Sequence, residues 1–162
     1  MTKARIYFLF GLLLLLITLS VVGCSSGDSS NMRAASSSGT SQTDLSLASL
    51  SAMPEFVQEA PPTVQEAYRF AVANPEVMHK IPCYCGCGAM GHQDNLGCYV
   101  KEFRPDGSIE FDNHATGCSI CVDITQDVMR LTRQGQDLKS IRAYVDQQYS
   151  QYGPSTNTPP VE

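Results

Sequence analysis

The hydrophobic pattern divides the chain into stretches of different character. Residues 6–22 are almost uniformly apolar and rich in leucine. Residues 24–52 are dominated by Ser, with few apolar side chains to offset the entropy of ordering them, so we expect a flexible linker there. Leu45, Leu47 and Leu50 are expected to pack loosely or not at all. Regularly spaced apolar positions then predict one folded domain, residues 53–153, followed by a polar tail, residues 154–162.

The first helix of the domain is marked by a start signal. Thr63-Val64-Gln65-Glu66 has the pattern of a capping box, with Thr63 as N-cap and Glu66 three residues later. We therefore predict a helix from about Val64 to Ala73, after an extended lead-in. Asn74-Pro75 is expected to stop it and to start another turn, with Asn74 as the cap.

Two more helices are predicted toward the C-terminus. Residues 121, 124, 128 and 131 are apolar and lie on one helical face, which directs Cys121 toward the domain interior. Cys118 lies one turn earlier, near the helix N-terminus, where the helix dipole favours a thiolate. Gly135 is expected to end this helix. Asp137 can cap the next, whose inward face carries residues 138, 141, 145 and 149.

Between these helical regions the pattern predicts a β-hairpin. Residues 99–103 and 109–111 read as strands, and the Pro105-Asp106-Gly107 sequence between them is a turn signal. The predicted fold class is mainly α: a small helical domain with a short β-hairpin and a Cys-rich loop.

The N-terminus has the features of an export signal. Lys3 and Arg5 precede the apolar run, which ends at Val21-Val22-Gly23-Cys24. This resembles a bacterial lipoprotein signal peptide, residues 1–23. The resemblance implies cleavage before Cys24 and lipidation, including a palmitate-type acyl chain, on this cysteine. A retained transmembrane helix is the alternative. Either way, we expect a membrane-anchored domain on the cell membrane that faces outside the cytoplasm.

The heptapeptide Pro82-Cys83-Tyr84-Cys85-Gly86-Cys87-Gly88 stands out from the helical pattern. Its three thiols occupy alternate positions, with Gly86 between the last two and Gly88 after them, which suits a backbone folded tightly around a bound species. Other cysteines and histidines follow it in short loops or at a helix start. The candidate site residues are Cys83, Cys85, Cys87, Cys98, Cys118, Cys121, His92 and His114.

Metal binding explains the crowded thiols better than disulfides do. A soft cation needs two to four sulfurs about 2.3 Å away, whereas disulfides stabilise most when they close long loops. The donors outnumber those of one tetrahedral site, which leaves open two metals, a polynuclear thiolate cluster, or one metal plus a disulfide.

The identity of the metal follows by elimination. Zinc usually takes paired Cys-x-x-Cys knuckles, and only Cys118 and Cys121 form one here. Iron–sulfur clusters are hard to install on a chain exported unfolded, and Val122 stands where covalent haem needs histidine. Copper(I) prefers thiolates. We therefore predict a metal ion, copper(I) rather than zinc, held for storage, delivery or sequestration.

Two other functions remain open at the level of sequence. A thiol–disulfide oxidoreductase could use Cys118 and Cys121, or Cys85 and Cys87. A disulfide-stapled interaction module could use all six domain cysteines. There is no hydrolytic triad, paired-carboxylate site or phosphate loop, so a binding protein is favoured over an enzyme.

Charge narrows the range of partners. The chain has a net charge of −5 and no basic patch, so we expect no nucleic-acid partner. The expected partners are the membrane, through the lipid on Cys24, a metal ion, and a copper-receiving or redox protein.

The motifs resemble those of a known family. The heptapeptide, Gly91-His92, Asn95-x-x-Cys98 and His114-x-x-x-Cys118-x-x-Cys121 are similar to the bacterial PCYCGC-motif family, over roughly Phe56 to Tyr149. Members are exported, mostly lipid-anchored proteins without a settled function. The resemblance implies that these cysteines and histidines form one common site.

A second resemblance covers only residues 118–153. A Cys-x-x-Cys, two helices joined by a glycine and a Tyr-x-x-Tyr-Gly ending are similar to the thiol-reductant subunit of cytochrome c maturation. That resemblance implies a small helical bundle and a redox-active pair at Cys118 and Cys121.

Overall fold

The computed structural model describes residues 44–162. The predicted signal peptide, Cys24 and most of the predicted linker lie outside the described residues. The helices and strands, in order, are α2 (Glu55–Gln58), α3 (Pro62–Ala73), α4 (Pro75–Met78), β1 (Val100–Phe103), β2 (Ile109–Phe111), α5 (Ser119–Arg133) and α6 (Leu138–Tyr149). The fold is mainly α with one antiparallel hairpin, as predicted.

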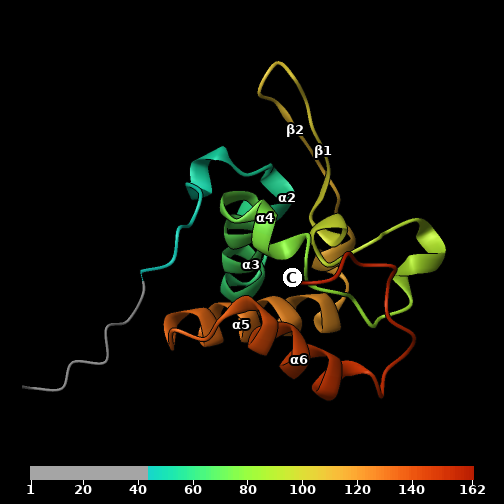
Figure 1. Ribbon diagram of the computed structural model, residues 1–162. Helices are drawn as coiled ribbons and strands as arrows, with labels where there is room; N and C mark the ends of the chain where they lie inside the picture. Colours follow the sequence, from blue (N-terminus) through green and yellow to red (C-terminus); the bar gives the residue numbers. More distant parts are fainter. Residues whose placement is uncertain (1–43) are drawn as a thin grey trace, which may run out of the picture. The chain divides into compact units, whose positions relative to one another are not determined.

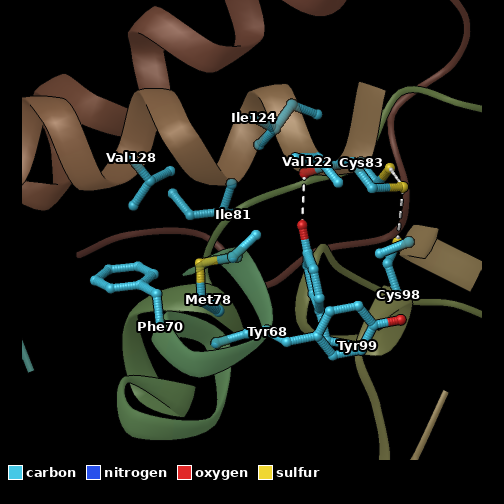
Figure 2. Packing of buried hydrophobic residues seen from close by; sticks show 14 of the residues in the cluster. Tyr68, Phe70, Met78, Ile81, Cys83, Cys98, Tyr99, Val122, Ile124 and Val128 are labelled. Carbon is cyan, nitrogen blue, oxygen red and sulfur yellow. Dashed lines mark hydrogen bonds between the residues drawn. The ribbon is translucent and has the colours of Figure 1, made fainter. Parts of the chain in front are cut away.

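Helix α5 is the centre of the helical packing. It contacts both α3 and α6, and the hairpin projects away from these helices (Figure 1). Its residues Ile124 and Val128 are fully buried, as the periodicity predicts. Figure 2 shows Val128 packed with Phe70 of α3, Met78 of α4 and Ile81, the residue that leads into the cysteine loop.

The connection from α5 to α6 uses the predicted signals. Gly135 has φ of 75°, and its N–H donates to the Thr132 carbonyl at 2.9 Å. The Gln136 N–H donates to the Leu131 carbonyl at 3.1 Å. These two bonds form a Schellman motif, which needs a left-handed residue where glycine stands. Asp137 then caps α6 by accepting from the Ser140 N–H at 2.9 Å.

The predicted capping box at α3 is wrong. The helix begins at Pro62, with Pro61 as its N-cap and no side-chain cap bond, so Thr63 lies inside the first turn. Proline suits the first helical position because its φ is already helical and it has no N–H to satisfy. Glu66 faces α5 instead, 3.3 Å from the Arg133 guanidinium.

Asn74 also acts differently from the prediction, although α4 does begin directly after it. Its side chain makes no cap bond to α4. It donates instead to the Ser46 carbonyl at 2.8 Å and the Phe70 carbonyl at 2.9 Å.

The ordered domain includes residues before position 53. Leu45, Leu47 and Leu50 are half-buried against the core, so the expectation of loose or absent packing is wrong for them. The Ala48 N–H donates to the Arg69 carbonyl at 3.0 Å, and the Arg69 side chain returns a 2.7 Å bond to the Ala48 carbonyl. The expected extended lead-in instead contains the single turn α2.

The hairpin brings two parts of the cysteine-bearing chain together. Val100 pairs with Phe111 and Phe103 with Ile109, with an irregular register near Lys101. Gly107 has φ of 85° in the turn. The base of this hairpin therefore holds the short 3₁₀ helix Leu96–Cys98 close to the 3₁₀ helix His114–Thr116. Between residues 44 and 162, no helix has both the length and the apolar character needed to cross a bilayer.

Candidate functional site

The heptapeptide forms a tight loop that turns its thiols inward. Gly86 and Gly91 have φ of 85° and 96°, a left-handed conformation that favours glycine, and they flank the 3₁₀ helix Cys87–Met90. Cys83 and Cys87 are buried and Cys85 is half-buried. The loop thus presents three sulfurs on one side.

The opposing donors come from three other elements. Cys98 ends the 3₁₀ helix before β1, and His114 begins the one after β2. Cys118 is the N-cap residue of α5, and Cys121 lies in its first turn. Figure 2 shows Cys83 and Cys98 at one end of the packed core, linked through sulfur contacts. The cysteine loop thus packs against the start of α5.

The sulfur atoms converge more closely than separate pairs would. Cys121 Sγ lies 3.2 Å from Cys98 Sγ, 3.4 Å from Cys83 Sγ and 3.5 Å from Cys85 Sγ. A disulfide joins two sulfurs at about 2.05 Å and leaves no third partner. Two thiolates bound tetrahedrally to one ion, each at about 2.3 Å, lie about 3.8 Å apart. The observed spacing is close to the second arrangement.

Four groups of donors among the described residues have a geometry that could hold a metal ion. Within each group the donor atoms all lie within 4.8 Å of one another. Two donors bound at about 2.3 Å can be at most about 4.6 Å apart, so small adjustments suffice. The groups are Cys85, His114, Cys118 and Cys121; Cys87, His92, Cys98 and His114; Cys83, Cys98 and Cys121; and Cys83, Cys85 and Cys87.

Asp112 positions both histidines. Its Oδ2 lies 3.6 Å from His92 Nε2, while His92 Nδ1 faces Cys98 Sγ at 3.6 Å. Its Oδ1 accepts the His114 backbone N–H at 2.7 Å, and His114 Nε2 lies 3.5 Å from Cys85 Sγ. For His92 the carboxylate lies behind the ring, as is common among metal-binding histidines, because it fixes the ring orientation and the tautomer. For His114 the contact is with the backbone.

A buried polar group fixes the backbone of Cys121. The Tyr99 hydroxyl donates to the Cys121 carbonyl at 2.8 Å (Figure 2). The same hydroxyl lies 2.7 Å from Thr125 Oγ1. The Asn95 amide donates to Thr125 Oγ1 at 3.1 Å. Tyr99 and Asn95 are fully buried, so these bonds hold the first turn of α5 against the cysteine loop.

The C-terminal tail contacts the site. Figure 1 shows this segment returning from α6 to end in the middle of the structure. The Cys83 N–H donates to Thr156 Oγ1 at 2.9 Å, and the Thr156 N–H donates to the Cys83 carbonyl at 3.0 Å. Thr158 adds a 2.8 Å bond from its hydroxyl to the Gln93 carbonyl. The polar tail therefore covers the backbone of the first cysteine.

The thiols differ in how firmly they hold their protons. Hydrogen bonds with neighbouring groups, first with Cys98 and then with His114, lower the pKa of Cys85 to about 5 despite its burial. A hydrogen bond with Cys121 lowers the pKa of Cys83 to about 7. Hydrogen bonds with their thiol neighbours raise the pKa of Cys98 and of Cys121. Full ionisation of so many adjacent sulfurs therefore calls for a compensating cation.

The prediction of an activated Cys118 is wrong. Burial raises the pKa of this thiol, although it sits at the N-terminus of α5. Desolvation of the thiolate outweighs its stabilisation by the helix N-terminus, because burial directly penalises the charged form. This disfavours Cys118 as an attacking thiolate and leaves it available as a metal donor, since a bound cation deprotonates its ligand.

The structure brings all eight predicted site residues into the four groups. His79, by contrast, pairs with Asp94 at 2.6 Å and belongs to none of these groups. Sequence reasoning missed Asp112, Tyr99 and Thr156. Only Asp112 has a local signal, because it follows the second predicted strand and lies two residues before His114.

Comparison with known proteins places the chain in a family. No curated protein and no solved structure matches it. The similarity of residues 118–153 to the thiol-reductant subunit stays a prediction. A family model described as "Protein of unknown function with PCYCGC motif" matches residues 13–161. That match spans most of the chain, including every donor described above, and the chain belongs to this PCYCGC family.

Proposed function

We propose that this protein is a lipid-anchored, extracytoplasmic metal-binding protein that holds copper(I) for storage, delivery or sequestration. The observation that carries the proposal is the convergence of six thiols and two imidazoles from four separate segments. A purely structural role for the thiols needs isolated pairs, whereas Cys121 has three sulfur neighbours within 3.5 Å. A metal ion accounts for this multiplicity.

The donor chemistry favours copper(I) over zinc. Thiolates are soft donors, and copper(I) is the softer of the two cations. Structural zinc sites are closed tetrahedra in which four ligands serve one ion. Here several sulfurs, such as Cys83 and Cys121, are shared between neighbouring groups of three or four donors. Sulfurs that are shared between sites suit a cation that accepts a low coordination number and bridging thiolates, as copper(I) does.

The cellular location rests on the N-terminal sequence. The Val-Val-Gly-Cys sequence ending at Cys24 follows a basic start and a Leu-rich run. Two or three acyl chains on the new N-terminus would hold the protein stably on a membrane. The anchored domain would exchange its metal with a copper-receiving or redox protein on the same face of the membrane.

A competition titration tests the metal assignment. The full-length chain, reduced and kept anaerobic, is titrated with copper(I) or zinc against a chromophoric chelator while free thiols are counted. We expect tight copper(I) binding, weaker zinc binding and thiols that react only after copper is removed. His79→Ala is the matched control, because His79 lies outside the four groups and should leave copper binding unchanged. Absence of binding at micromolar metal would contradict the proposal.

Incorporation of labelled palmitate tests the anchor. The wild-type chain is expected to carry the label and to fractionate with membranes. Cys24→Ser should lose the acyl label, because the modified sulfur is gone. Equal labelling of the two chains would overturn the lipoprotein assignment while leaving the metal assignment intact.

A further inference from the structure

The four donor groups overlap in a regular pattern. Cys83, Cys85, Cys87, Cys98 and Cys121 each belong to two groups, whereas Cys118 and His92 each belong to one. Every pair of groups has one donor in common. For five of the six pairs that donor is a cysteine, and for the sixth it is His114. Four points that are all joined in pairs have the connectivity of a tetrahedron.

From this pattern we infer that the site assembles a four-copper(I) cluster with bridging thiolates, rather than a set of independent ions. The inference rests on the proposed function, since it specifies how the same donors hold copper. Each group marks one copper position, and each shared cysteine bridges two positions. A thiolate sulfur has the lone pairs to bind two soft cations at once.

The donor count matches trigonal coordination of four ions. Five bridging cysteines supply two bonds each, and Cys118 and His92 supply one each. The total is twelve bonds, or three for each copper. One ring nitrogen binds one ion, so His114 is a fourth donor to either of its two groups rather than a bridge.

The charge also balances closely. Four copper(I) ions carry four positive charges and six thiolates carry six negative charges, so the cluster has a net charge of −2. Six thiols lose their protons as the four ions bind, and no electron is transferred. The two imidazoles are neutral donors. The small residual charge suits a site whose bridging sulfurs are mostly buried.

The distances between the sulfur atoms fit such a core. Cys83, Cys85 and Cys121 are also mutually within 3.5 Å, although they span three different groups. In the inferred cluster, these three cysteines bridge the three pairs formed by the same three metal positions, so they outline one open face between those positions. Cys83 and Cys85 lie 3.3 Å apart, and Cys87 and Cys98 lie 3.7 Å apart, which are separations that a shared ion can span.

The protein shields four of the five bridging cysteines, whereas the fifth, Cys85, is half-buried. Cys83, Cys98 and Cys121 have no exposed surface, and Cys87 is 1% exposed. Cys118, which belongs to one group only, is half-buried. The ring of His92 lines a cavity of about 470 Å³ that is also bordered by His79, Met90 and Asp94. Metal exchange is therefore expected at the partly exposed donors, Cys85, Cys118 and His92, rather than at the four shielded bridges.

Anaerobic native mass spectrometry of the full-length chain during copper(I) addition tests the inference. We expect the four-copper form to appear early and to dominate over the one-, two- and three-copper forms. X-ray absorption should show a copper–copper scattering shell. Binding of one or two coppers without that shell would overturn the cluster but preserve the proposed function. No copper binding would overturn both.

Matched serine variants separate bridging from terminal donors. Cys83→Ser removes a donor from two groups and should reduce the maximum below four coppers. Cys118→Ser removes a donor from one group only, and His114 remains in that group as a donor. This variant should still bind four copper ions but lose copper to a chelator faster than the wild type. His79→Ala should match the wild type. Cys87→Ser repeats the bridging test if Cys83→Ser does not fold. Equal losses from bridging and terminal variants would contradict the cluster.

Discussion

At the scale of single residues, the organisation of the site depends on groups that do not themselves bind metal. Asp112 is held at both ends of its backbone: its N–H donates to the Tyr99 carbonyl at 2.9 Å, and its carbonyl accepts the Tyr68 hydroxyl at 2.8 Å. Its carboxylate therefore faces the two histidines from a fixed place. Burial raises the pKa of Tyr68, which keeps the hydroxyl protonated as the donor in this contact.

Asp112→Asn is predicted to weaken copper binding without changing the number of ions bound. The amide retains the size of the side chain but loses the charge that orients His92 and stabilises its metal-facing nitrogen. Loss of such a carboxylate behind a histidine ligand typically lowers metal affinity by about 10- to 100-fold. The measurement is a chelator competition titration together with the copper stoichiometry.

A neighbouring carboxylate provides the control for this prediction. Asp94 bonds to His79 and to the Gly97 N–H, outside the donor groups. Because that loop bond matters for folding, we expect Asp94→Asn to alter stability more than copper affinity. The role assigned to Asp112 is contradicted if both variants bind copper as tightly as the wild type.

At the scale of elements, the sequence predicts the helices and the hairpin from local signals, but it does not predict the contacts between distant segments. The sequence predicts helices α5 and α6 from the spacing of their apolar residues, from Gly135 at the end of α5 and from Asp137 at the start of α6. These signals can be recognised because each acts within one or two helical turns. The hairpin follows from its turn residues for the same reason. The docked tail could not be predicted, since its bonds to Cys83 join positions 73 residues apart and Thr156 has no distinctive neighbours.

Thr156→Val is predicted to destabilise the domain and to loosen the cysteine loop. Valine keeps the volume but leaves the buried Cys83 N–H without its acceptor, and an unsatisfied buried donor costs about 1–3 kcal/mol. The measurement is the free energy of unfolding of the copper-free chain by denaturant, followed by the rate of copper loss to a chelator.

The adjacent residue supplies a control for the tail. Asn157 is exposed, so Asn157→Ala should leave both the free energy of unfolding and the copper off-rate close to the wild type. If Thr156→Val matches Asn157→Ala in both measurements, the tail does not support the site.

At the scale of the whole molecule, the cluster of thiols is part of the hydrophobic core. Cys83, Cys98 and Cys121 are fully buried together with Tyr99 and Ile124. A small domain that devotes interior volume to adjacent sulfurs gives up apolar packing there. Bound metal would offset the stability lost with that packing, because a ligand that binds only the folded state stabilises it by mass action.

Copper loading is predicted to raise the melting temperature of the reduced chain by roughly 10 °C or more. Free copper at about 100 times the dissociation constant adds about 2.7 kcal/mol, and each kcal/mol is worth about 4 °C in a domain of this size. Anaerobic calorimetry with and without copper measures the shift. An unchanged melting temperature at saturating copper would show that the unfolded chain binds copper as tightly as the folded domain does.

The sequence predicts which residues form the site but not how they share a metal. The eight donors stand out because cysteine and histidine in tight loops have few other uses. Their overlap into four groups depends on distances between segments as far apart as Cys83 and Cys121, which no local pattern contains. Tyr99 and Thr156 escape prediction because they act on the site through backbone contacts, which no local pattern marks. Asp112 has only the weak signal of its place two residues before His114.

The most direct test of the account is elemental analysis of the full-length protein isolated anaerobically from cells that produce it, with thiols counted before and after chelation. We expect stoichiometric copper, little zinc, and six domain thiols that become reactive only when copper is removed. A protein that contains neither metal, and whose cysteines are already paired as disulfides, would contradict it.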